Sequence, residues 1–433
     1  MSRISRRNFV KLMGAGGAAS VLGMSGCASS PKTSAKAAPR VVVVGGGFGG
    51  ATCAKYLRMY DATLNVTLIE QNASYVTCPG SNWVLAGMRR IDDLTQNYAA
   101  LRDRHGVKVV HDRVVRVDPG KRLVALASGK TIEYDRLVMS PGIDFRWEAI
   151  EGYDEAASQV MPHAWKAGPQ TLLLQKQLKA MPDGGTVVIS PPPMPFRCPP
   201  GPPERASMIA HYLKANKPRS KILILDAKDS FSKQGLFMDA WKELYPGMIE
   251  WVPASSGGKV VRVNAKAGTV HTDVGDVHKA DVVNIIPPQR AAQIAIATGL
   301  SNNAGWCPVN QHTFESVLIP GVHVIGDASV AGALPKSGHT ANNIGKMTAA
   351  AIVSLFRGTR PPLPSHVNTC YSLVGPDYGI SIAAVYRLDD DGQLVGIKGA
   401  GGLSPASAPP LQRSQEAGYA QGWYQSITAD TFG

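Results

Sequence analysis

Apolar and polar positions along the chain alternate between short strands and helices, the pattern of α/β domains. An apolar run at residues 40–44 predicts a buried parallel strand, followed by a glycine-rich turn and a helix over residues 51–60. Further apolar runs predict strands at residues 65–69 and 136–140. This succession of strand, helix and strand is typical of one half of a doubly wound sheet.

The same pattern begins again in the middle of the chain. A helical stretch at residues 171–181 leads into an apolar run at residues 183–189, and further strands are predicted at residues 221–226 and 281–286. We therefore predict an α/β fold with two Rossmann-like doubly wound domains.

The last part of the chain differs in composition. After a strand at residues 323–325 and a helix over residues 342–357, a proline-rich linker spans residues 359–364 and a strand-rich segment follows. We predict a small C-terminal α+β interface domain here. The predicted boundaries are 1–37 for a signal peptide, 38–150 and 293–360 for the two parts of a nucleotide-binding domain, 151–292 for the second Rossmann-like domain, and 361–433 for the interface domain.

A glycine pattern at the first turn predicts a dinucleotide site. Gly45, Gly47 and Gly50 satisfy G-x-G-x-x-G between a strand and a helix, and Glu70 ends the next strand. The first helical turn would supply backbone N–H groups for a pyrophosphate. Glu70 would accept a hydrogen bond from a ribose hydroxyl.

The second Rossmann-like domain lacks this fingerprint. A proline-rich loop at residues 190–203 takes its place, and prolines provide neither the N–H donors nor the close backbone approach that a pyrophosphate needs. We therefore predict that this domain does not bind NAD(P)H. A shorter motif, Gly326 and Asp327, follows the strand at residues 323–325. In the two-dinucleotide-domain flavoproteins that this pattern resembles, the aspartate lies on the ribityl chain of FAD.

The amino-terminal segment predicts export. Arg6 and Arg7 form a twin-arginine pattern ahead of a weakly hydrophobic stretch and a cleavage site before Ala38. We therefore expect a periplasmic location, with a lipoprotein-type anchor at Cys27 as the alternative. Residues 1–37 contribute six positive charges and no acids, so the formal net charge of +13 falls to +7 without them. No basic, aromatic-interleaved patch indicates nucleic-acid binding, and no stretch reaches the roughly 18 apolar residues of a transmembrane helix.

Two of the six cysteines lie where thiol chemistry is expected. Cys198 sits in the proline-rich loop at the carboxyl end of a predicted parallel strand, where open sheets place ligands, and Cys370 lies just beyond the linker. If the two pair, the bridge is either redox-active or a structural staple, which exported proteins also use. Glu204 follows at the start of a predicted helix, as a candidate for proton transfer or for helix capping.

The other cysteines have different surroundings. Cys78 follows the second strand, in a segment that passes near the flavin ring in this fold, and it either forms a thioether to the flavin or packs as a small buried thiol. Cys53 on the first helix and Cys307 are predicted to be packing thiols. Removal of Cys27 with the leader leaves an odd number of cysteines, so at least one is free or bound to something other than another internal cysteine.

Several segments resemble one known family, and the similarity extends over the whole chain after the leader. They include residues 195–201 around Cys198, residues 324–328 with Asp327, and residues 368–372 around Cys370. The chain is similar in these segments to the flavoprotein subunit of flavocytochrome c sulfide dehydrogenase. This resemblance implies a glutathione reductase-like fold.

The resemblance also implies a site and a partner. It implies FAD joined covalently through Cys78, a redox disulfide between Cys198 and Cys370, and a small c-type cytochrome subunit. The chain itself has no C-x-x-C-H motif, so the haem must lie outside it. Hydrosulfide would attack the disulfide, and electrons would pass through the flavin to haem. The resemblance favours Cys370 as the flavin-side sulfur and Cys198 as the sulfur acceptor, an order that the sequence itself leaves open.

Three other functions fit parts of the pattern. A sulfide:quinone oxidoreductase shares the fold and the paired cysteines, but residues 412–433 carry only scattered aromatics in place of its apolar or amphipathic C-terminal anchor. A non-catalytic exported flavin or sulfur carrier would bind FAD without being reduced by sulfide. A pyridine-nucleotide reductase would need the NAD(P)H binding that the proline-rich loop argues against.

Overall fold

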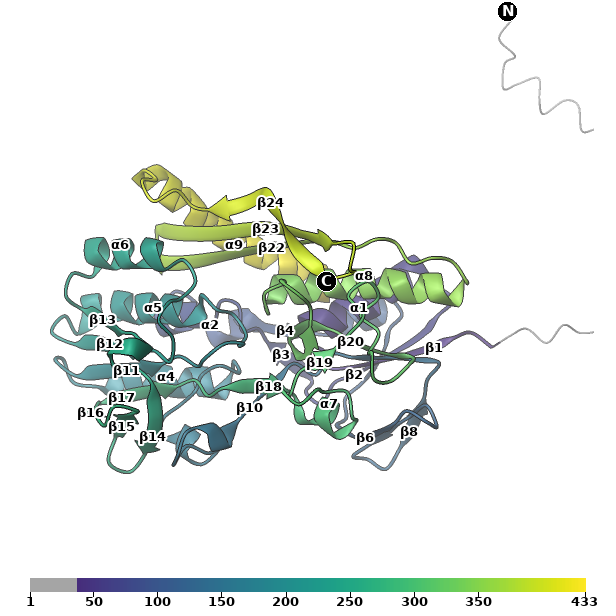
Figure 1. The fold of residues 1–433 in the computed structure, drawn as a ribbon, viewed down its shortest axis with the longest axis horizontal. Helices are drawn as coiled ribbons and strands as arrows, with labels where there is room; N and C mark the ends of the chain where they lie inside the picture. Colours follow the sequence, from purple (N-terminus) through teal and green to yellow (C-terminus); the bar gives the residue numbers. More distant parts are fainter. Residues whose placement is uncertain (1–36) are drawn as a thin grey trace, which may run out of the picture. The chain divides into compact units, whose positions relative to one another are not determined.

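The first Rossmann-like module is built on a five-stranded parallel sheet. The structure, a computed structural model, describes residues 37–433, so the predicted leader with Arg6, Arg7 and Cys27 lies outside the described residues. The sheet has the order β20-β9-β1-β2-β5, so a strand from late in the chain completes a sheet begun at the first strand (Figure 1). The strands are β1 Arg40–Val44, β2 Asn65–Ile69, β5 Lys108–Val110, β9 Arg136–Met139 and β20 Val322–Val324.

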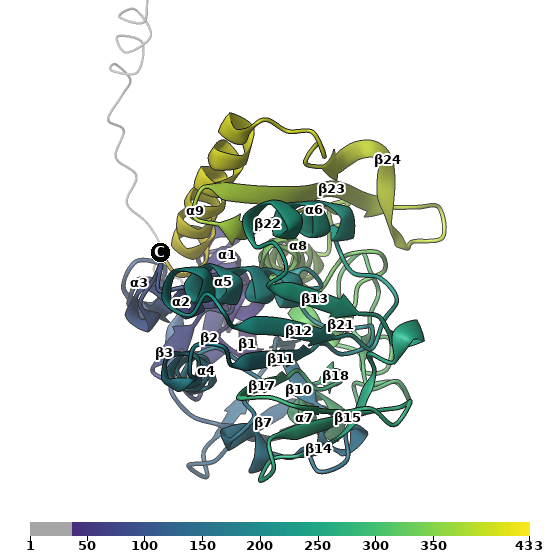
Figure 2. The same cartoon turned by 90° about the vertical axis from the view of Figure 1, so that its left-hand side faces the viewer.

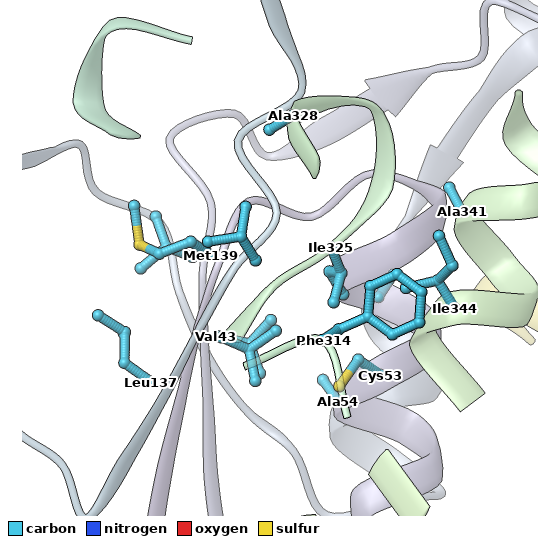
Figure 3. Close-up of a cluster of buried hydrophobic side chains, with 14 of the residues drawn as sticks. Val43, Cys53, Ala54, Leu137, Met139, Phe314, Ile325, Ala328, Ala341 and Ile344 are labelled. Atoms are coloured by element: carbon cyan, nitrogen blue, oxygen red, sulfur yellow. The ribbon is translucent and has the colours of Figure 1, made fainter. Parts of the chain in front are cut away.

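Two helices, α1 (Phe48–Tyr60) and α8 (Gly338–Phe356), pack together beside this sheet. A Cβ at Gly345 would lie 2.6 Å from the Gly49 carbonyl oxygen, so only glycine permits their close approach. The close-up in Figure 3 shows the resulting core, in which Cys53 of α1 lies among apolar side chains of the sheet and of α8. Cys53 and Cys307 are both fully buried, as packing thiols are.

The second Rossmann-like module contains a four-stranded parallel sheet of order β13-β12-β11-β17. The α/β class with two doubly wound sheets, predicted from the sequence, is confirmed. The strands are β11 Thr186–Ser190, β12 Lys221–Leu225, β13 Ile249–Val252 and β17 Val282–Ile285, and the helices are α4 Pro169–Ala180, α5 Gly201–Asn216 and α6 Gln234–Leu244.

Each module also contains a small antiparallel sheet. In the chain, this sheet comes just before the strand that pairs with the first strand of the module, β9 with β1 and β17 with β11. The sheet β6-β7-β8 precedes β9, and the sheet β14-β15-β16 precedes β17. The strands are β6 Val114–Asp118, β7 Leu123–Leu126, β8 Thr131–Glu133, β14 Val260–Asn264, β15 Thr269–Thr272 and β16 Val277–Lys279. The two modules therefore share the order in which their elements follow one another along the chain, as well as a parallel central sheet.

The C-terminal region is a three-stranded antiparallel sheet and a long helix. Strands β22 (Ser365–Gly375), β23 (Tyr378–Leu388) and β24 (Leu394–Leu403) form the sheet, and helix α9 spans Pro410–Phe432. Strand β22 contacts α8 of the first module and α5 of the second, and Figure 2 shows the sheet lying over the helices. Within residues 37–433, no helix combines the length and apolar character needed to span a bilayer.

Candidate active site

The turn between β1 and α1 is too tight for side chains. Gly45 has a φ of 96°, and a Cβ there would lie 2.3 Å from the Ser140 carbonyl oxygen. A Cβ at Gly50 would lie 1.9 Å from the Gly45 carbonyl oxygen. Gly47 caps α1 without a side-chain hydrogen bond, so the first backbone N–H groups of the helix are available to an anion.

A cavity of about 1120 Å³ opens at this turn. Six of the seven residues predicted to bind the cofactor line it, although they come from four separate parts of the chain. The seventh, Gly50, acts through the tight turn instead. The six lining residues are Gly45, Gly47, Glu70, Cys78, Gly326 and Asp327.

Asp327 has the clearest requirement for a ligand in this cavity. Its Oδ1 is buried and has no hydrogen-bond partner among the described residues, while its Oδ2 lies 3.8 Å from Arg197 Nη1. Burial raises the pKa of Asp327, and the Arg197 charge opposes that rise. A hydroxyl donor such as the ribityl chain of FAD would satisfy the unpaired oxygen.

Glu70, directly after β2, lines the same cavity. Its Oε2 accepts a hydrogen bond of 2.8 Å from the Gly46 N–H, and its Oε1 accepts one of 3.0 Å from the Asn72 N–H. Oε1 also accepts from Asn72 Nδ2 at 3.1 Å, whereas Oε2 has no second donor within the described part of the chain. Because a carboxylate oxygen has two lone pairs, Oε2 retains capacity for a ribose hydroxyl. The residues of this cavity therefore fit FAD: an open helix N-terminus for the pyrophosphate and carboxylates for the hydroxyl groups.

Cys78 lies in the wall of the same cavity, after strand β3 (Ser74–Val76). Its Sγ is 3.6 Å from the Trp165 carbonyl oxygen. The neighbouring Arg197 also lines the cavity and donates to the same carbonyl. The thiol therefore borders the cavity at which the flavin was predicted to bind.

Cys198 is fixed by its backbone at the edge of this region. It has a φ of 57°, rare for a residue with a side chain, and its N–H donates a 2.8 Å hydrogen bond to the Lys336 carbonyl. A Cβ at Gly201 would come within 3.1 Å of the Cys198 Sγ, so the glycine leaves room for the sulfur. Burial raises the pKa of the Cys198 thiol, and negative charge at Cys370 raises it further.

Cys370 lies in the middle of β22, paired with Ile382 of β23. Asn368 is two residues earlier, on the same face of the strand, and its Nδ2 lies 3.4 Å from the Cys370 Sγ. Ser337 Oγ donates a 2.6 Å hydrogen bond to Asn368 Oδ1, which fixes the amide. Burial raises the pKa of Cys370, whereas the Lys233 charge lowers it.

All five cysteines of the described residues are free thiols in this structure. The structure nevertheless places Cys198, of the second module, near the strand of Cys370, in the C-terminal sheet. Gly201 lies beside Cys198 Sγ, and Glu204, one helical turn later, accepts a hydrogen bond from the Leu373 N–H of that strand. Neither lines the cavity itself; Arg197, next to Cys198, does. The redox bridge between them stays a prediction.

Glu204 lies near both thiols, since its charge raises the pKa of each, and it accepts hydrogen bonds from three donors. Its Oε1 accepts from Trp83 Nε1 at 3.2 Å and from the Leu373 N–H at 3.1 Å, and its Oε2 accepts from Asn82 Nδ2 at 3.1 Å. No amide of its own helix is among these donors, so Glu204 does not cap α5. Desolvation raises its pKa despite these bonds, and a carboxylate with a raised pKa beside thiols suits proton transfer.

Two basic residues of this site, Arg197 and Lys233, were not among the residues predicted from the sequence. Arg197 lies directly before Cys198, and that position was a usable signal. Lys233 reaches Cys370 from the start of α6, and nothing in its local sequence distinguishes it from a solvent-exposed loop lysine.

The fold and the site define a class: a two-dinucleotide-domain flavoprotein with a pair of thiols beside its flavin cavity. Sequence models of three families match the chain. They are described as sulfide dehydrogenase (flavocytochrome c) flavoprotein chain, central, over residues 171–287; flavocytochrome c sulphide dehydrogenase, flavin-binding, over residues 362–432; and pyridine nucleotide-disulphide oxidoreductase, over residues 39–171. The chain belongs to the family of flavocytochrome c sulfide dehydrogenase flavoprotein chains.

Individual relatives agree with this assignment. The flavoprotein chain of sulfide dehydrogenase (flavocytochrome c) from Chlorobaculum thiosulfatiphilum is 64% identical over 45 residues, which are 10% of this chain and 94% of that sequence. The mitochondrial sulfide:quinone oxidoreductase of Mus musculus is 24% identical over 311 residues, or 67% of this chain and 65% of the mouse sequence. This chain therefore spans slightly less than two thirds of the mouse relative.

A solved structure shares the fold over nearly the whole chain. The X-ray structure of the sulfide:quinone oxidoreductase from Aquifex aeolicus superimposes with a TM-score of 0.70 at 19% identity, covering 91% of this chain and 92% of that one. At this identity the likeness establishes the fold alone. The flavin-binding family match and the cavity together support FAD as the cofactor.

Proposed function

We propose that this chain is a periplasmic sulfide dehydrogenase flavoprotein, which oxidises hydrosulfide through Cys198 and Cys370 and passes the electrons to a c-type cytochrome subunit. One observation carries the proposal: Cys198, Cys370 and Glu204 lie near one another beside a cavity whose residues fit FAD, and Glu204 accepts a hydrogen bond from the Leu373 N–H in the strand that carries Cys370. The family membership and the name of the Chlorobaculum relative support sulfide as the substrate and a cytochrome as the partner.

The proposed reaction begins with the bridged form of the two cysteines. Hydrosulfide attacks Cys198 Sγ, a new S–S bond forms there, the old S–S bond breaks, and its electron pair stays on Cys370 Sγ as a thiolate. Glu204 accepts the proton of the persulfide. FAD, when bound, supplies a two-electron acceptor that can release its electrons singly to haem. Return to the bridged form breaks the outer S–S bond at Cys198, re-forms the bond between the Cys198 and Cys370 sulfurs and leaves two electrons for that acceptor. Per cycle, one hydrosulfide becomes zero-valent sulfur and releases one proton and two electrons.

The decisive experiment is anaerobic addition of hydrosulfide to FAD-loaded protein. We expect bleaching of the flavin absorbance in the wild type, and its loss in Cys198→Ser and in Cys370→Ser. Cys307→Ser is the matched control, because Cys307 is also buried but lies outside the thiol pair. Flavin that stays oxidised in the wild type would favour the non-catalytic carrier instead.

A thioether between Cys78 and FAD is part of this proposal. The position of Cys78 in the cavity wall supports it. The intact mass of the denatured protein should include the flavin, and Cys78→Ala should lose that added mass while its cavity still binds FAD. A wild-type mass without flavin would refute the covalent link.

The electron acceptor separates this proposal from its strongest rival. The alignment with the mouse enzyme and the fold likeness to the Aquifex enzyme favour sulfide:quinone oxidoreductase as the second candidate. Sulfide-dependent reduction of cytochrome c, compared with reduction of a water-soluble quinone by the same preparation, distinguishes the two. For the location, replacing both Arg6 and Arg7 with lysine should hold the protein in the cytoplasmic fraction.

A further inference from the structure

A buried lysine lies on the Cys370 side of the thiol pair. Lys233 is 5% exposed and begins helix α6 with a φ of 61°. Its Nζ donates hydrogen bonds of 3.0 Å to the Cys370 carbonyl and 2.8 Å to Ser372 Oγ. The second module therefore inserts a cation beside the strand that carries one of the two sulfurs.

This cation has no carboxylate partner among the described residues. No ion pair formed within residues 37–433 includes Lys233. The ionisable groups that face it are the two thiols, Glu204 and Glu416. Glu204 is held by three other donors, and Glu416 is held by Ser404 and Gln412.

Burying an ammonium without a counter-ion is costly, and buried groups with a shifted pKa are concentrated at functional sites. Burial lowers the pKa of Lys233 to about 8, and negative charge at Cys370 is the largest effect that opposes this. A thiolate at Cys370 would therefore complete the ion pair that the resting site lacks.

The two sulfurs lie in unlike electrostatic surroundings. Cys370 faces the Lys233 ammonium and the Asn368 amide, which favour its thiolate, and the Glu204 carboxylate, which disfavours it. Cys198 faces the charges of Cys370 and Glu204, which disfavour its thiolate, and those of Arg197 and Arg205, which favour it. Arg197 is already paired with Asp327, and Arg205 donates to neutral oxygens, including the His163 and Ala164 carbonyls, whereas Lys233 has no carboxylate partner among the described residues. In thiol–disulfide exchange the sulfur that forms the more stable thiolate leaves faster.

We propose that Lys233 is a positioning residue that stabilises the thiolate leaving from Cys370 Sγ, and thereby directs hydrosulfide to Cys198. This inference rests on the proposed function, because it assigns the order of bond making and breaking in that reaction. The S–S electron pair goes to the sulfur beside the cation, and the new S–S bond forms at the other sulfur. The order that the sequence leaves open is thus set by a residue outside the cysteine motifs.

The first test titrates the thiols of the reduced, full-length protein without sulfide. Alkylation by iodoacetamide across pH, read for each cysteine by peptide mass, gives the midpoint of each thiol. We expect Cys370 to react at lower pH than Cys198 in the wild type. In Lys233→Met the Cys370 midpoint should rise by about one pH unit or more, a tenfold or greater loss of thiolate at neutral pH, and Lys233→Arg should restore it in part.

Lys217→Met is the matched control. Lys217 is also buried, at 8% exposure, and its ammonium also binds backbone carbonyls, those of Lys179 and Met181, but it faces neither thiol. An equal shift of the Cys370 midpoint in both variants, or no shift in Lys233→Met, would overturn the proposal. If Lys233→Met does not fold, the wild-type titration still decides, because Cys198 ionising before Cys370 contradicts it.

The second test locates the persulfide after anaerobic hydrosulfide treatment of the oxidised protein. We expect it on Cys198 in the wild type and divided between Cys198 and Cys370 in Lys233→Met. A wild-type persulfide on Cys370 would refute the proposed polarity. The titration needs no sulfide turnover, so failure of the proposed function and failure of the Lys233 assignment give different results.

Discussion

Substituting alanine for Gly50 tests the tight turn on which the cofactor site depends. The added methyl carbon would lie 1.9 Å from the Gly45 carbonyl oxygen, so the turn must open by more than about 1 Å to reach an ordinary contact. Overpacking of this kind costs about 1–3 kcal/mol, whereas alanine in place of glycine in a helix gains up to about 1 kcal/mol. Gly50→Ala should therefore destabilise the protein and displace the helix end that would hold the pyrophosphate.

The variant Gly418→Ala separates the cost of the clash at Gly50 from the gain in helix propensity. Gly418 also lies within a helix, α9, but a Cβ there meets no atom within 4 Å. The two variants share the propensity gain, so their free energies of unfolding should differ by about 1–3 kcal/mol, the cost of the clash alone.

Urea unfolding with a common m value measures that difference, and the flavin content per chain measures the effect on the site. We expect Gly50→Ala to unfold at lower urea concentration and to contain less flavin than Gly418→Ala. Equal midpoints together with equal flavin contents would refute the close turn and its role in cofactor binding.

Three further predictions follow from single side chains. In the wild type the rate of flavin bleaching should rise with pH, because burial raises the pKa of Glu204 and only its deprotonated form accepts a proton; Glu204→Gln should remove this rise. The ratio of wild-type to variant rates at each pH cancels the ionisation of sulfide itself. Asp327→Ala should lower the flavin content of the purified protein by removing the buried, unpaired Oδ1, with the urea midpoint of the flavin-free forms as a control for folding. Phe314→Ala, at a fully buried position in the core of Figure 3, should lower the free energy of unfolding by about 3–5 kcal/mol, and a loss below 1 kcal/mol in urea titration would contradict that packing.

The central strands β1 and β11 were predictable because each is largely buried on both faces and carries a run of apolar residues. The predicted strands at residues 40–44 and 65–69 coincide with β1 and β2. Helix α1 begins at Phe48, earlier than the predicted residue 51, because the glycines after the turn continue the helix rather than preceding it. The spacing of the glycines and the acid after the second strand predicted residues that line the cavity, because the pattern of this turn is local in sequence.

The remaining features depend on contacts between distant segments. The scattered aromatics of the tail gave no sign of a helix, yet α9 is 23 residues long, because Ala417, Ala420 and Tyr424 pack against other elements. The small antiparallel sheets also went unpredicted, since their strands are short and largely exposed. Lys233 could be assigned to the site only once the fold had placed α6 beside β22.

The anchoring of the two cysteines has a consequence for turnover. Cys198 is tied through its N–H to the Lys336 carbonyl, and Cys370 is held in register within an antiparallel ladder, while both sulfurs are in the thiol form. If the two cysteines form the proposed bridge, its opening and closing would need rotation of side chains rather than movement of a loop, because the backbone on both sides is held. Such rotations take place within nanoseconds for exposed side chains, far faster than the rearrangement of a loop or a domain.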